Sequence, residues 1–188
     1  DTVTFAGTEF TTSGFIGGDA VNGVTLNSSG AVATASVAGS PYPITPSAAT
    51  GTGVSNYAID YSNGTLTVIP RALSVVANNA IRVYGQTNPV FSGTITGVQN
   101  GDNITASYSS SAATNSPVGT YDIEPTLIDS GGKLVNYAVT ITNGVLTVVD
   151  LPRLLGISES PEGTFIVEWQ VYAGRTYQFQ YKTNLSDL

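Results

Sequence analysis

The chain has 188 residues, of which 41% are hydrophobic and 10% are charged, whereas roughly 25% charged residues is usual in a globular domain. Its 13 acidic and 6 basic residues give a formal net charge of −7, so few cations are present to neutralise a nucleic acid or an anionic membrane surface. Histidine and cysteine are both absent, which removes disulfides, thiolate nucleophiles, zinc–thiolate sites and the commonest general base.

Residues 1–70 end in a pattern that is typical of a β-hairpin, "NYAIDYSNGTLTV" at residues 56–68. Apolar and polar residues alternate up to Asn63-Gly64, and a β-branched run follows. In a two-residue hairpin loop of this kind, a type I′ turn gives both turn residues a positive φ. We therefore predict a closing hairpin with its turn at Asn63 and Gly64.

Residues 71–150 repeat the same landmarks in the same order. "NYAVTITNGVLTV" at residues 136–148 predicts a second hairpin, with its turn at Asn143 and Gly144. Upstream, "SPVGTYDI" corresponds to "SPYPI" of the first region, and Gly101-Asp102 corresponds to Gly18-Asp19. An unchanged order of landmarks with altered loop lengths is expected of two folded copies of one unit.

The two copies are not equally complete. The second begins with "RALSVVANNAIRVYGQTNP" at residues 71–89, where "ALSVVA" predicts a strand that has no counterpart in the first copy. A missing strand exposes unpaired backbone groups that can template a strand from another chain. One hypothesis is therefore that the 153–188 segment of one molecule pairs with the 1–70 copy of its neighbour. The alternative is that flanking sequence supplies the missing strands.

Residues 151–188 form a third region with the runs "RLLGISES", "TFIVEWQVY" and "TYQFQYKTN". Alternation in these runs predicts strands of a partial β-sandwich. Tyr177, Phe179 and Tyr181 share one face of the last run. These aromatic side chains are candidates for contact with a partner or a sugar, and packing in a core is the alternative.

Together these patterns predict an all-β chain of tandem small β-domains, at residues 1–70 and 71–150, with a partial third β-domain at 151–188. Each repeat is expected to be a β-grasp-like fold or an immunoglobulin-like sandwich, because periodicity does not separate the two. No apolar run approaches the roughly 20 residues of a membrane span, so no membrane insertion is expected.

Two aspartates are the candidates for a metal site. Asp19 and Asp102 occupy corresponding places, each after a glycine, and either could be a calcium ligand or a turn or helix-cap residue. The pair Asp122 and Glu124 is interpreted as a solvated strand face. With no histidine and no convergent polar cluster, the chain is predicted not to be an enzyme and to hold no cofactor.

The motifs "RVYGQTNP", "GVQNGDNITA", "SPVGTYDI" and "NGVLTV" closely resemble the MBG-type repeat, of the YGX variety, of bacterial cell-surface proteins. Residues 153–188 resemble a β-sandwich segment of secreted proteins of the Verrucomicrobia and Planctomycetes type. The resemblance implies an extracellular, non-catalytic structural or adhesive module, whose partners are other copies of itself, neighbouring surface-protein domains or glycans. A self-assembling fibre subunit and a carbohydrate-binding module are the alternative functions.

Overall fold

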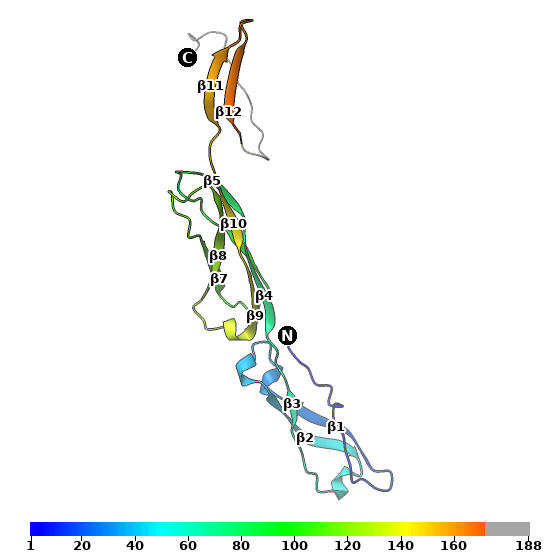
Figure 1. Ribbon diagram of the computed structural model, residues 1–188. Helices are drawn as coiled ribbons and strands as arrows, with labels where there is room; N and C mark the ends of the chain where they lie inside the picture. Colours follow the sequence, from blue (N-terminus) through cyan, green and yellow to red (C-terminus); the bar gives the residue numbers. More distant parts are fainter. Residues whose placement is uncertain (172–188) are drawn as a thin grey trace.

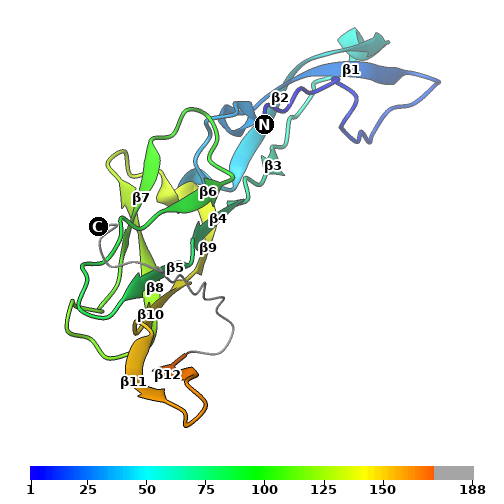
Figure 2. The same cartoon turned by 90° about the horizontal axis from the view of Figure 1, so that it is seen from above.

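The computed structural model describes residues 1–171, in which strands are joined by loops and four short 3-10 turns. Residues 1–70, residues 71–150 and a β-hairpin follow one another along an elongated molecule (Figure 1). Seen from above, the first region extends to one side of the second (Figure 2). The predicted all-β class is confirmed.

The region 71–150 contains two sheets. Its strands are β4 (Arg71–Ala77), β5 (Ala80–Val83), β6 (Gly93–Thr96), β7 (Ile104–Ser109), β8 (Gly119–Asp129), β9 (Tyr137–Thr142) and β10 (Gly144–Val149). One sheet has the order β5-β10-β8-β7 and the other has the order β6-β4-β9. β4 and β5 follow each other closely in the chain but belong to different sheets, so this segment connects the two.

Alternation along the strands places apolar side chains between these sheets. On β4, for example, Leu73, Val75 and Ala77 are buried, whereas Ala72 and Ser74 are exposed. The buried apolar residues of the described chain are Leu73, Val75, Ala77, Ile104, Ala112, Ile123, Tyr137, Leu146 and Val148. Fully burying one large apolar side chain stabilises a fold by about 1.5–3 kcal/mol, so this set accounts for much of the stability of the region.

Of the two architectures that the sequence left open, the second region has the layered arrangement of a sandwich. Its core lies between two sheets, and residues 1–171 contain no α-helix that could cross a sheet as in a β-grasp fold. The pairing is mixed, since β4 pairs in parallel with β9 and β5 pairs in parallel with β10.

The region 1–70 has a single three-stranded sheet with the order β1-β2-β3. Its elements are β1 (Ala20–Asn27), β2 (Tyr42–Thr52), β3 (Gly64–Leu66) and the 3-10 turns η1 (Ser29–Ala31), η2 (Val37–Gly39) and η3 (Val54–Asn56). None of the buried apolar residues given above lies in this region. The first region therefore has strands but no comparable core.

The prediction of a hairpin at each Asn-Gly is wrong. β9 and β10 belong to different sheets, and none of Asn63, Gly64, Asn143 and Gly144 has a positive φ. Asn143 instead marks the point at which the chain passes from one sheet to the other. Gly144 is needed there for a different reason, because a Cβ would lie 2.6 Å from the carbonyl oxygen of Asn78.

The C-terminal part of the described chain is an antiparallel hairpin of β11 (Arg153–Glu159) and β12 (Phe165–Gln170). These strands fall where the runs "RLLGISES" and "TFIVEWQVY" predict them. The third run, with Tyr177, Phe179 and Tyr181, lies outside the described residues.

Candidate functional site

A tyrosine hydroxyl fastens the Gly-Asp loop at one corner of the second repeat. The hydroxyl of Tyr137 donates a hydrogen bond to Asp102 Oδ2 (2.7 Å) and accepts one from the backbone N–H of Gln99 (3.0 Å). Between these partners, Asn100 and Gly101 have φ values of 57° and 72°. Two central residues with positive φ are the mark of a type I′ turn, so this turn type is present, but at Asn100-Gly101 rather than at Asn143-Gly144.

The environment of Tyr137 changes its acidity. Its side chain is 8% exposed, and this burial raises the pKa of the phenol above its usual range. The hydrogen bond to Asp102 and the negative charge of that carboxylate raise the pKa further. The hydroxyl therefore stays protonated and continues to donate to Asp102 over the whole neutral range.

The first repeat has the same contact between a tyrosine hydroxyl and the Gly-Asp turn, and its tyrosine is more exposed to solvent. The hydroxyl of Tyr57 donates to Asp19 Oδ2 (3.0 Å) and accepts from the backbone N–H of Ile16 (3.2 Å). Gly17 and Gly18 supply the positive φ values of the turn. The recurrence of "NYA" together with Gly-Asp is thus explained by a tyrosine and an aspartate that meet in each repeat, and the sequence alone did not predict this pairing.

Direct hydrogen bonds join the two repeats end to end. Asn136 Oδ1 accepts from the hydroxyl of Ser36 (3.0 Å) and from the backbone N–H of Val37 (2.9 Å). Asn100 Nδ2 donates to the carbonyl oxygen of Ala33 (3.0 Å). The loop that follows η1 in the first repeat thereby rests on η4 (Leu134–Asn136) and on the Gly-Asp turn of the second.

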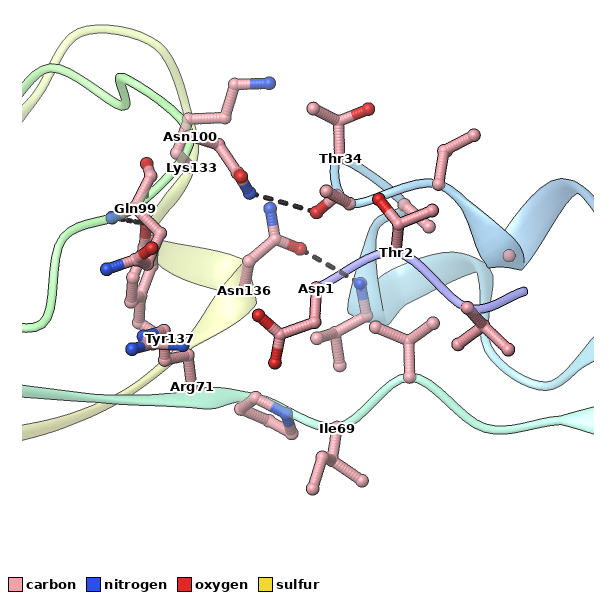
Figure 3. A pocket seen from close by; sticks show the side chains of 18 of the residues that line it. Asp1, Thr2, Thr34, Ile69, Arg71, Gln99, Asn100, Lys133, Asn136 and Tyr137 are labelled. Atoms are coloured by element: carbon pink, nitrogen blue, oxygen red, sulfur yellow. Dashed lines mark hydrogen bonds between the residues drawn. The ribbon is translucent and has the colours of Figure 1, made fainter.

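A cavity of 680 Å³ opens at this junction (Figure 3). Its lining includes the acidic residues Asp1 and Asp102 and the basic residues Arg71 and Lys133, together with Asn136. The carboxylate of Asp102 already accepts the hydrogen bond of Tyr137, and Asn136 already joins the repeats. The chemistry of the lining is therefore that of a polar joint between two domains.

The "RVYGQTNP" motif has a structural role that sequence reasoning missed. Arg82 is 5% exposed, and its guanidinium donates to Asn88 Oδ1 (2.7 Å) and to the carbonyl oxygens of Val83 (3.3 Å) and Ala113. Asn88 Nδ2 in turn donates to the carbonyl oxygen of Ala112 (2.7 Å). The signal was a charged residue inside an apolar strand, which indicates a buried cation with a full set of acceptors.

The candidate metal ligands are not brought together. Asp19 and Asp102 lie at corresponding corners of different repeats, each bonded to a tyrosine. Within residues 1–171, no group of three or more acidic side chains is placed to hold a metal ion. Asp122 and Glu124 are both exposed on β8, as predicted for a solvated strand face. In the same part of the chain, no helix is long and apolar enough to cross a membrane.

Two all-β units in tandem, each with a tyrosine-fastened turn, define a repeat protein built from copies of one module. The family model described as MBG domain (YGX type) matches residues 3–67 and 73–147. The chain belongs to this family, whose domains are repeat modules that typically occur in surface proteins. No curated protein and no solved structure matches the chain.

Proposed function

We propose that the chain is a non-enzymatic spacer module of an extracellular bacterial surface protein, in which the repeats set a fixed length and direction. The observation that supports this role most directly is the hydrogen-bonded junction. Three hydrogen bonds connect the repeats through Asn136 and Asn100, so the joint holds one orientation. A flexible linker would instead let the two domains rotate freely.

The short connection between the repeats supports the same conclusion. Only residues 67–70 separate the end of β3 from the start of β4. Pro70 restricts this connection further, because its ring fixes φ. A connection this short limits how far the two repeats can rotate relative to each other.

The distribution of polar groups supports a non-enzymatic role. Asp19 and Asp102 accept hydrogen bonds from tyrosines of their own repeats. The guanidinium of Arg82, on β5, donates to neutral acceptors such as Asn88 Oδ1. These groups hold turns and loops in place. Catalysis instead needs a nucleophile or base that faces an open cleft.

Immunogold labelling of intact cells tests the location. Antibodies against the purified 188-residue chain should label unpermeabilised cells of the source bacterium at a distance from the envelope. Label that appears only after permeabilisation would refute an extracellular role.

Small-angle scattering of the full chain tests the fixed joint. Asn136→Ala removes the acceptor for Ser36 and Val37, so the distribution of inter-repeat distances should broaden while each repeat stays folded. Asn56→Ala is the matched control, because Asn56 is the counterpart of Asn136 in the first repeat and, unlike Asn136, does not line the cavity at the joint. Equal scattering curves for the native chain and Asn136→Ala would show that these bonds do not fix the orientation.

A further inference from the structure

The first repeat presents a backbone edge that is covered in the second repeat. β9 is paired in parallel with β4 through six residue pairs, from Arg71↔Tyr137 to Val76↔Thr142. The counterpart of β9 is the segment 57–62, which pairs with no strand of the described chain. Of its side chains, Tyr57 is more exposed than its buried counterpart Tyr137, whereas Tyr61 at 43% and Ile141 at 50% are both exposed.

Gly64 is an independent sign that a strand belongs beside this segment. Its counterpart Gly144 has no room for a side chain, because a Cβ would lie 2.6 Å from the carbonyl oxygen of Asn78 and 2.9 Å from that of Ala77. At Gly64, a Cβ would meet only Ile44, at an ordinary 3.6 Å, and φ is not positive. Nothing in residues 1–171 requires a glycine at position 64, whereas a strand crossing there would require one.

β11 has the sequence and the exposure of such a strand. Pro70-Arg71-Ala72-Leu73-Ser74-Val75 leads from the first repeat into β4, and Pro152-Arg153-Leu154-Leu155-Gly156-Ile157 leads from the second repeat into β11. On β4, Leu73 and Val75 are fully buried. Leu155 and Ile157, their counterparts on β11, are each 62% exposed.

We propose that β11 of one molecule pairs in parallel with residues 57–62 of a second copy and acts there as β4 acts in the second repeat. In the register of β4 and β9, Arg153 lies opposite Tyr57, Leu155 opposite Ile59 and Ile157 opposite Tyr61. Leu155 and Ile157 are then covered by the first repeat of the neighbouring molecule.

Charge and strand direction agree with this pairing. Arg71 acts electrostatically on the phenol of Tyr137, which is bonded to Asp102. In the proposed register Arg153 takes the corresponding place beside Tyr57, which is bonded to Asp19, so a cation meets an anionic corner. β11 also has an antiparallel neighbour, β12, as β4 has β6, with the difference that the β11–β12 ladder shifts register between Leu154 and Gly156.

The pairing has to be intermolecular. The second repeat lies between β11 and the first repeat of the same molecule in both views (Figures 1 and 2). Donor and acceptor are different surfaces, so the contact is heterologous and extends into an open chain of molecules unless its rotation closes a ring. This assembly goes beyond the spacer role and is measured on the purified chain, so either proposal can fail without the other.

Sedimentation velocity of the full chain over a range of concentrations tests the proposal. Species larger than a monomer should increase with concentration. Leu155→Asp puts a charge into the contact and should weaken association by about a hundredfold or more. Leu154→Asp is the matched control, because Leu154 is the sequence counterpart of Ala72, which is exposed on β4, and the change should leave association within about threefold of native.

The acceptor is tested by Gly64→Val. The side chain should block the incoming strand, while the melting temperature of the first repeat should not fall, because a Cβ at Gly64 meets only Ile44 at an ordinary contact distance. Leu155→Asp keeps its acceptor and Gly64→Val keeps its donor, so a mixture of the two variants should form one-to-one dimers and nothing longer. The proposal is overturned if the native chain stays monomeric at millimolar concentration, if Leu154→Asp and Leu155→Asp weaken association equally, or if the mixture forms no dimer.

Discussion

The two repeats share a family and a set of landmarks, yet only the second has a buried apolar core. Ile123 on β8 is fully buried, whereas its counterpart Ile44 on β2 is only partly buried. The local sequence around the two is similar, so local propensity does not explain the difference. Ile123 packs in one cluster with Ala77 of β4, with Ala112, and with Leu146 and Val148 of β10, whereas the single sheet of the first repeat has no second sheet of that repeat packed on it.

The comparison shows that the burial of a residue depends on strands distant from it in sequence. Tyr137 is paired with Arg71 in the β4–β9 ladder and is nearly buried, whereas Tyr57 makes the same hydroxyl contacts but is more exposed. The hydrogen bonds from tyrosine to the Gly-Asp turn are therefore formed within each repeat, whereas the covering of its apolar side chains requires a second sheet.

The largest effect is expected for a core truncation made in both repeats. Ile123→Ala should lower the free energy of unfolding by about 2–5 kcal/mol, because it leaves a cavity between the sheets. Ile44→Ala should cost clearly less, because its site is partly open. Chemical denaturation, with hydrogen exchange followed on peptides from each repeat, measures both. Equal losses would show that the first repeat has a core of its own.

A glycine pair gives the next largest effect. Gly144→Ala should destabilise the second repeat by about 1–3 kcal/mol, because its Cβ collides with the backbone at Asn78. Gly64→Ala should be neutral, or stabilising by up to about 1 kcal/mol, since the site has room and the unfolded chain loses freedom. Thermal melts of the two variants provide the measurement, and a destabilised Gly64→Ala would contradict the open edge.

A smaller effect is expected at the tyrosine corners. Tyr137→Phe should cost about 1–2 kcal/mol at neutral pH, because Asp102 loses its donor in a largely buried place. Tyr57→Phe is the matched change and should cost less, since its corner is more open to water. A larger loss of stability for Tyr57→Phe than for Tyr137→Phe would contradict the conclusion that the hydroxyl of Tyr57 is the more exposed of the two.

Because the pKa of Tyr137 is raised, we expect the stability of the fold to depend on pH in the alkaline range. Burial raises the pKa of Tyr137 in the folded chain, so the unfolded chain releases this proton first as the pH rises. The contribution of Tyr137 to stability is therefore complete below the unfolded pKa of about 10 and decreases above it. Stability measured from pH 8 to 11 should fall less steeply in Tyr137→Phe than in the native chain, and identical slopes would refute the shift.

Sequence patterns were sufficient for the all-β class and for the tandem repeat, because alternation and self-similarity can be recognised in the sequence itself. The turn at Asn143-Gly144 was predicted wrongly because an Asn-Gly pair gives the same signal at a hairpin and at a change of sheet. Pairing of β9 with β4 is parallel and joins residues more than sixty positions apart, which no short window reveals. For the same reason the bond between Tyr137 and Asp102 became evident only in three dimensions.

The parallel pairing of β5 with β10 has a mechanical consequence. The chain enters the second repeat at Arg71 at one end and leaves after Val149 at the other, and β4, β5 and β10 run in the same direction between these points (Figure 1). Tension applied through the chain pulls β4 and β5 one way and β10 the other, along their own axes. The ladder hydrogen bonds between β5 and β10 are then loaded together in shear, and rupture requires all of them to fail at once rather than in sequence. A single-molecule pulling experiment on the chain should therefore find the second repeat to be its most force-resistant part.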